Sequence, residues 1–154
     1  MSLLAAMKQK KKERLTVKHP LYQRDISMRY AYAMGVALVA ATGGGISETG
    51  RAELEKLVYA IGLPEDTLEK VIATAEAAAA ESIDTVVDTV LEKEEQYCLL
   101  LEMHLAALRS GAEQQREQQE LIGGFRELML LSAEEDEFLR NFAQTALEKN
   151  ASMA

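Results

Sequence analysis

Apolar residues recur at intervals of three and four along most of the chain from residue 26 onwards. The clearest segment has them at i, i+3, i+4 and i+7: Leu54, Leu57, Val58 and Ile61. The following segment repeats this spacing: Leu68, Val71, Ile72 and Ala75. Such positions share one face of an α-helix, whereas a strand would alternate apolar and polar residues. We therefore predict helices throughout, including the valine-rich stretch 83–91, whose composition resembles a strand but whose spacing does not.

Glycines and capping residues divide these stripes into about seven short helices. Gly43, Gly44 and Gly45 follow the first helix and are expected to form a structural turn with Ser47, which is placed to cap the next helix. The polar, glutamine-rich stretch 112–119 is predicted to be a loop or a frayed first turn. The fold class that follows is all-α, a compact bundle of short helices.

Two later boundaries carry sharper signals. Gly62 stands where a helix-terminating glycine belongs, with Pro64 at the start of the next helix. Residues 132–135 read Ser-Ala-Glu-Glu, a capping box in which the serine hydroxyl and the second glutamate each satisfy the other's backbone N–H. The pair Gly123-Gly124 lies inside a predicted helix, where each glycine costs about 1 kcal/mol relative to alanine. We expect a close helix contact at this pair.

A weak internal repeat links the two halves of the chain, which are therefore candidates for similar folds. Four apolar positions recur 68 residues later: Leu54, Leu57, Ile61 and Leu63 correspond to Ile122, Phe125, Met129 and Leu131. With two more residues inserted, Leu68 and Ile72 correspond to Phe138 and Phe142. The last helix is accordingly predicted to bury its apolar side chains: Phe138, Leu139, Phe142, Ala146 and Leu147.

Charge is distributed unevenly between the N-terminus and the remainder. Residues 1–30 hold eight Lys or Arg against two acids, so this segment carries +6 and the remainder −14 of the net −8. We expect a basic, mobile N-terminal segment over residues 1–24 and a single helical domain over 25–150. An acidic body argues against nucleic-acid binding, which needs a basic face.

The basic segment is a candidate binding element through five residues: Lys8, Lys10, Lys11, Lys12 and Arg14. Its charge suits an anionic membrane surface or the acidic body of a neighbouring copy. The simpler interpretation is a solvated terminus without a partner.

Compartment and membrane topology follow from the cysteine and from the apolar runs. The single Cys98 excludes an intramolecular disulfide, and no run of 18 apolar residues is present to span a membrane. The apolar residues 1–7 precede the lysines, which is the reverse of the order in a secretory signal. We expect a cytoplasmic protein.

Candidate chemistry is sparse. His104 shares an apolar helix face with Leu101, Leu105 and Leu108, where a lone histidine is most often a hydrogen-bonded core residue. Glu102 lies only two residues away, so the Glu-x-x-His spacing of di-iron bundles is absent. Weak candidates for metal ligands remain: Glu95, Glu102, His104 and Asp136.

Other suggestive residues have structural interpretations. Cys98 lies nearly two helical turns before His104, so the two can share a face, but a buried free cysteine is common. The glycine run lacks the Gly-Lys-Ser/Thr of a phosphate loop. The methionines can fill the core or line an adaptable groove: Met28, Met34, Met103 and Met129.

Three short segments resemble the tellurite-resistance TerB-like family. They are residues 40–47 (Ala-Ala-Thr-Gly-Gly-Gly-Ile-Ser), 51–54 (Arg-Ala-Glu-Leu) and 60–64 (Ala-Ile-Gly-Leu-Pro). The resemblance covers most of residues 26–149 and implies an all-helical fold of two similar halves. It also implies a stress-linked, non-catalytic module that binds metal in some members and associates with membrane-linked complexes. The acidic positions of the family's glycine turn fall here on Gly43 and Gly50, so its metal site lacks carboxylates in this chain.

Three hypotheses for function follow. The first is a TerB-like module that binds a protein partner or a second copy of itself, with peripheral contact to an anionic membrane through the basic segment, without a cofactor and without catalysis. The second is a metal-binding stress protein that uses acids such as Glu95, Glu102 and Asp136. The third is an enzyme whose site the sequence does not reveal.

Overall fold

The computed structural model of this chain describes residues 2–15, 19–110 and 112–153. These residues are all-helical, as predicted, and contain no strand. They form eight helices: α1 (Leu3–Leu15), α2 (Ile26–Ala41), α3 (Glu48–Ala60), α4 (Thr67–Ala77), α5 (Ala80–Thr89), α6 (Lys93–Arg109), α7 (Ala112–Leu128) and α8 (Ala133–Met153). The valine-rich stretch that resembles a strand in composition is helix α5.

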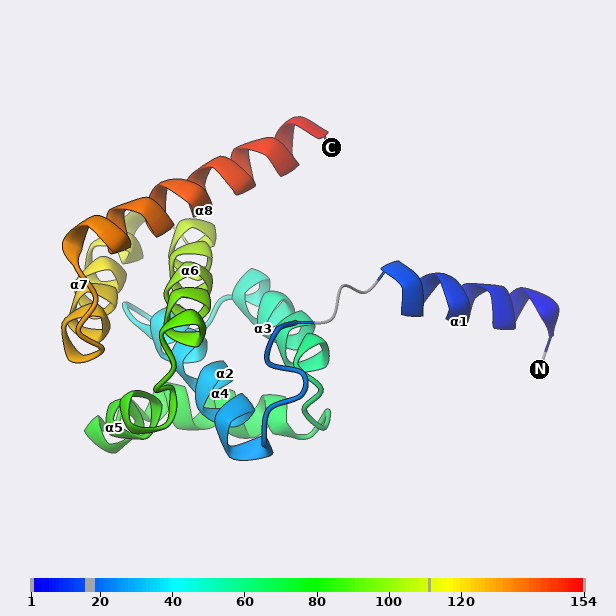
Figure 1. Cartoon of the computed structure of the whole chain (residues 1–154), viewed down its shortest axis with the longest axis horizontal. Helices are drawn as coiled ribbons and strands as arrows, with labels where there is room; N and C mark the ends of the chain where they lie inside the picture. The colour runs from blue at the N-terminus through cyan, green and yellow to red at the C-terminus, as the bar shows by residue number, and fades with distance from the viewer. Residues whose placement is uncertain (1, 16–18, 111, 154) are drawn as a thin grey trace.

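Helix α2 is the centre of the bundle, and the helices α3 to α7 pack around it (Figure 1). Every residue from Ala31 to Ala40 is buried, as expected of a helix that is apolar on all sides. Asp25 caps its N-terminus by accepting a hydrogen bond from the Met28 N–H at 3.0 Å. At Gly35 an added Cβ would lie only 3.0 Å from Leu99 Cδ1, so glycine allows α6 to approach closely.

Helix order and packing recur in the second half of the chain. Helices α3 and α4 pack against α2, and α7 and α8 pack against α6. Adding 68 to the bounds of α2 gives 94–109, which coincides almost fully with α6. The triplet α2–α3–α4 therefore corresponds to α6–α7–α8, with α5 as the connection between them.

The turns after α3 and α7 show the same correspondence in their hydrogen bonds. The carbonyl of Val58 accepts a hydrogen bond from the Leu63 N–H at 3.0 Å. At the positions 68 residues later, the carbonyl of Arg126 accepts a hydrogen bond from the Leu131 N–H, also at 3.0 Å. This is the Schellman pattern, which ends a helix with one residue in the left-handed conformation. That residue is Gly62 in the first turn (φ 75°) and Leu130 in the second (φ 59°).

Helix α8 departs from the repeat, because it buries less than predicted. Phe138 is 69% exposed and Phe142 is 55% exposed, whereas their counterparts Leu68 and Ile72 in α4 are each 7% exposed. The reason lies in the neighbours: α4 packs against both α2 and α3, while α8 packs against α6. The buried line of α8 instead includes Ala143, which is fully buried.

The N-terminal region also differs from the prediction. Residues 3–15 form helix α1, although the sequence lacks a helical period there. The body starts before residue 25, because Leu21 is 1% exposed and belongs to the core, and His19 contacts α6. Residues 16–18 of the expected mobile segment lie outside the described part of the chain.

Two expectations for the second half were wrong. Residues 112–119 are the first turns of α7, where a loop was expected. The glycine pair in α7 has no close neighbour, since a Cβ built on Gly123 or Gly124 meets no atom within 4 Å. None of the described helices is long and apolar enough to cross a membrane.

Candidate functional site

The four candidate metal ligands do not converge on one point. Glu95 pairs with Arg24 at 2.5 Å, and Glu102 contacts His19 at 2.5 Å. His104 and Asp136 do meet, at 2.6 Å. Within the described ranges, no group of three or more His, Cys, Asp or Glu side chains is close enough to hold a metal ion.

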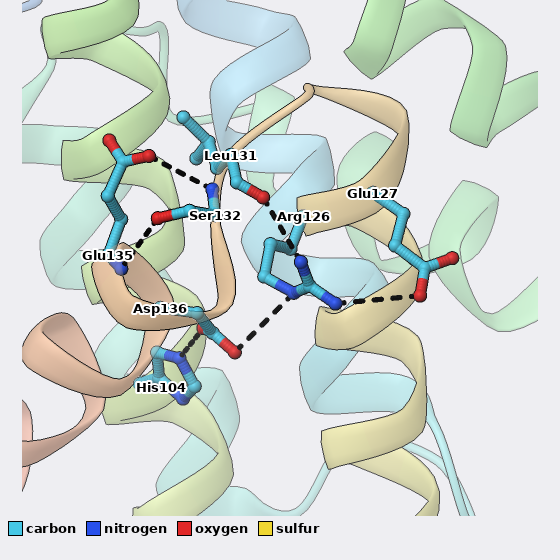
Figure 2. Close-up of polar contacts among 7 residues, drawn as sticks. All are labelled: His104, Arg126, Glu127, Leu131, Ser132, Glu135 and Asp136. Atoms are coloured by element: carbon cyan, nitrogen blue, oxygen red, sulfur yellow. Dashed lines mark hydrogen bonds and ion pairs between the residues drawn. The ribbon is translucent and has the colours of Figure 1, made fainter.

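The His104–Asp136 pair ties α6 to the start of α8 (Figure 2). His104 is fully buried, and its Nδ1 has no hydrogen-bond partner among the described residues. A protonated ring would leave a buried N–H donor unsatisfied at Nδ1, so the ring is neutral and Nε2–H donates to Asp136. Burial lowers the pKa of His104, and the hydrogen bond with Asp136 opposes that shift. His104 is thus the hydrogen-bonded core histidine that its position suggested.

Arg126 completes this cluster from α7. Its Nη1 donates to the Leu131 carbonyl at 3.1 Å, and its Nε lies 3.9 Å from Asp136 Oδ2 (Figure 2). One guanidinium therefore joins the end of α7, the turn and the first turn of α8. The cluster stabilises the corner between the helices.

The capping box predicted at residues 132–135 is present beside this cluster. The Ser132 N–H donates to Glu135 at 2.9 Å and the Glu135 N–H donates to the Ser132 hydroxyl at 3.1 Å (Figure 2). Glu135 also accepts a hydrogen bond from the Tyr97 hydroxyl of α6. The Tyr97 hydroxyl, and after it the two groups of Ser132, lower the pKa of Glu135 to about 2.

A cavity of about 260 Å³ lies between α2, α3 and α6. His19 and Glu102 line it, and so do Glu53 and Arg109, which form an ion pair at 3.3 Å. The Leu21 N–H donates to His19 Nδ1 at 3.2 Å, so the proton of His19 is on Nε2 and points to Glu102. Both ring nitrogens of His19 are therefore engaged within the fold.

Two further groups close to Glu102 have raised pKa values. Burial, and then the negative charge of Glu102, raise the pKa of Tyr32, whose ring lies edge-on to His19 at 5.1 Å. Burial and the charge of Glu102 likewise raise the pKa of Cys98, which keeps it as the thiol and not the nucleophilic thiolate. Sequence reasoning missed the His19–Glu102 contact, because the two residues are 83 positions apart and His19 was assigned to the tail.

The glycine turn between α2 and α3 is structural. Gly43, Gly44 and Gly45 all have positive φ, at 91°, 143° and 89°. A side chain at Gly43 would meet Gln114 of α7, since an added Cβ would lie 3.2 Å from Gln114 Cβ. Ser47 caps α3 as expected, its hydroxyl accepting from the Gly50 N–H at 3.1 Å.

The surface of α8 is the most distinctive feature of the second half. Glu134, Phe138 and Phe142 follow at i, i+4 and i+8 and are all exposed. We call these three residues the α8 stripe. Tyr97 and Leu139 line a cavity of about 400 Å³ with Glu134, Glu135 and Phe138, so the stripe lies beside a hollow with acidic and apolar walls.

The basic candidates lie on α1, at the opposite side of the molecule from the start of α8 (Figure 1). Lys8 and Lys10 are exposed, while the side chains of Lys11, Lys12 and Arg14 lie outside the described part of the structure. In the part of the chain that the structure describes, helix α1 stands away from the other helices (Figure 1), and its apolar end is exposed: Leu3 is 85%, Leu4 65% and Met7 50% exposed. Among the described residues, both α1 and the α8 stripe thus present exposed apolar and charged side chains.

Comparison with protein-family models, with curated proteins and with solved structures finds no match for this chain.

Proposed function

We propose that this chain is a non-catalytic helical module of the TerB-like type that acts by binding a partner protein. The observation that carries the proposal is the exposure of Phe138 and Phe142, at 69% and 55%, on an ordered helix. Burying a phenylalanine side chain stabilises a fold by roughly 1.5–3 kcal/mol relative to leaving it in water. Two adjacent exposed phenylalanines therefore favour a surface that is covered when a partner binds.

The internal correspondence strengthens this interpretation. The α4 residues at matching positions, Leu68 and Ile72, are covered by the chain itself. On α8 the same kind of residue is left exposed by the helices that the structure describes, so a partner supplies the missing contact. Aromatic residues are enriched among the residues that dominate binding energy in protein interfaces.

The assignment to the TerB-like type is supported by the paired triplets α2–α3–α4 and α6–α7–α8. The resemblance implies two similar helical halves, and the helix order, packing pairs and Schellman turns all recur at an interval of 68 residues. A stress-linked cytoplasmic role of the tellurite-resistance kind comes with that type.

The alternatives have less support from the geometry. A metal-binding protein would gather its ligands, but Glu95, Glu102 and His104 are engaged in three separate pairs. An enzyme needs a free acid, base or nucleophile, whereas both nitrogens of His19 are engaged and Cys98 is held as the thiol.

Site-specific photocrosslinking tests the proposal directly. Photoreactive p-benzoylphenylalanine replaces Phe138 in the full chain, which is expressed in the cells of origin and irradiated. The matched control carries the same group in place of Leu91, which is 70% exposed between α5 and α6. We expect an adduct of defined mass at position 138 that is lost on adding Phe142→Ser, and none at position 91. The absence of any adduct at position 138, or equal adducts at both positions, would contradict the proposal.

A further inference from the structure

We propose that the partner of the α8 stripe is helix α1 of a second copy of this chain, bound antiparallel to α8. The inference rests on the proposed function, because it names the partner that the exposed surface binds. Each copy offers one α1 and one α8, so a pair of molecules exchanges two equivalent contacts around a two-fold axis.

The first step is that α1 needs a partner to be stable. It has 13 residues, and isolated helices shorter than about 12–15 residues are marginal in water. Its sequence makes this worse, because Lys8 and Lys12 stand at i, i+4, where like charges repel. A helix of this kind, packed on nothing in its own chain, is expected to form on a surface that supplies apolar contact and negative charge.

The second step is that the α8 surface supplies both apolar contact and negative charge. The order of these groups along α8 suits the order of the apolar and basic residues along α1. In α1 the exposed apolar residues are Leu3, Leu4 and Met7, and the basic run starts at Lys8. In α8 the acids of the first turn come first, and the exposed phenylalanines follow. Antiparallel pairing therefore brings the apolar end of α1 to the phenylalanines and its basic half to the acids.

The third step is the register. Leu4 and Lys11 are seven residues apart in α1, and Phe142 and Glu135 are seven residues apart in α8, so both pairs span about 10 Å along the helix axis. With Leu4 opposite Phe142, position 11 is opposite Glu135 and position 12 is opposite Glu134. The same antiparallel arrangement sets the negative end of the α1 dipole, with its basic residues, beside the positive, acid-rich start of α8.

Two observations favour a second copy over other occupants. Helix α1 projects away from its own body on the side opposite to the start of α8, so the contact forms between molecules (Figure 1). A membrane surface would select a helix with a continuous apolar face. In α1 the apolar and basic residues are separated along the helix instead of around it.

Charge reversal tests this contact in the full chain by sedimentation velocity over a concentration series. Lys8→Glu with Lys12→Glu reverses two charges of α1 and takes the helix from +4 to neutral. Glu134→Lys with Glu137→Lys reverses two exposed acids and takes residues 134–137 from −4 to neutral. We expect each reversed variant to raise the dimer dissociation constant about tenfold or more. A chain with all four changes again has opposite charges at the facing positions 12 and 134, so its constant should return towards that of the wild type.

A matched control separates the contact from net charge. Glu55→Lys with Glu65→Lys makes the same change in net charge as the α8 reversal but on exposed positions of α3 and the α3–α4 turn. This control should leave the dimer constant unchanged. Dimerisation should also weaken with salt, because the Debye length falls from about 10 Å at 0.1 M to about 3 Å at 1 M.

Three results would overturn the inference. They are a monomer at every concentration, a dimer that no α1 variant weakens, and a monomer whose α1 binds phosphatidylserine vesicles but not neutral phosphatidylcholine vesicles. The proposed function is read out separately, by photocrosslinking at position 138. If the chain sediments as a monomer but forms an adduct with another protein at that position, the proposed partner binding stands. The same result excludes the second copy as the partner.

Discussion

At the scale of single residues, His104 shows how burial and a carboxylate partner compete. Its ring is fully buried, which favours the neutral form, while Asp136 at 2.6 Å favours the charged form. Burial is the larger effect, so the pKa of His104 is lowered from its usual 6.5. The unfolded chain therefore takes up a proton on this ring at a higher pH than the folded chain does.

This gives a pH dependence of known sign. The stability linked to His104 is complete above about pH 6.5 and is lost as the pH falls below it, because the unfolded state then binds the extra proton. His104→Gln keeps a donor for Asp136 but cannot titrate. We expect the melting temperature of the wild type to fall more than that of His104→Gln between pH 8 and pH 5.5, which calorimetry can measure. Parallel curves would show that His104 titrates alike in both states.

Glu135 also has a lowered pKa, of about 2, but here hydrogen bonds and not burial lower it, and the Tyr97 hydroxyl is the largest cause. We expect Tyr97→Phe to raise the pKa of Glu135 towards its usual value. Nuclear magnetic resonance titration of the side-chain carboxyl carbon measures this directly. The stabilising effect of these hydrogen bonds is present above pH 4.5 and is lost as the pH falls towards 2. An unchanged pKa in Tyr97→Phe would exclude the hydroxyl as the cause.

At the scale of helices, periodicity and capping signals predicted those elements whose own sequence contains the determinant. Ser47 caps α3, and the box at residues 132–135 caps α8, because each cap joins groups only three residues apart. The exposure of Phe138 could not be predicted in this way, and burial was wrongly expected. Period alone shows that a face is apolar but not whether another helix lies near enough to cover it. The contact of His19 with Glu102 was missed because the two residues are distant in sequence, and a local pattern does not show which distant residues meet.

The glycine pair of α7 offers a prediction at this scale. Because a Cβ at Gly123 or Gly124 meets no atom within 4 Å, each alanine substitution should stabilise the fold by up to about 1 kcal/mol through helix propensity. Gly62→Ala is the matched control and should destabilise, since φ is 75° and its Cβ would lie 2.9 Å from Tyr22 Cε2. Urea unfolding curves measure all three. A loss of stability in Gly123→Ala would mean that another molecule packs there.

At the scale of the whole molecule, the N-terminal segment has two parts with different roles. Helix α1 projects from the body, whereas residues 19–24 are part of it (Figure 1). His19 contacts Glu102, Leu21 lies in the core, and Arg24 pairs with Glu92 and Glu95 of α6. The basic charge and the lack of a helical period placed the boundary after residue 24, because neither pattern reveals a single buried leucine in that segment. The structural boundary lies before His19.

Two truncations distinguish these roles, and they lead to opposite expectations. Removing residues 1–15 should change the melting temperature little at a concentration where the chain is monomeric, because α1 is not packed against the body. Removing residues 1–21 also deletes His19 and Leu21. A leucine-to-alanine change in a core costs about 2–5 kcal/mol of unfolding free energy. Each kcal/mol lowers the melting temperature by about 2–4 °C in a chain of this size, so a fall on the order of 10 °C is expected.

Leu21→Ala in the full chain serves as the point control and should reproduce most of that fall. Equal melting temperatures for the two truncations would place the boundary after residue 21, and a large fall on removing residues 1–15 alone would show that α1 packs on its own body in solution.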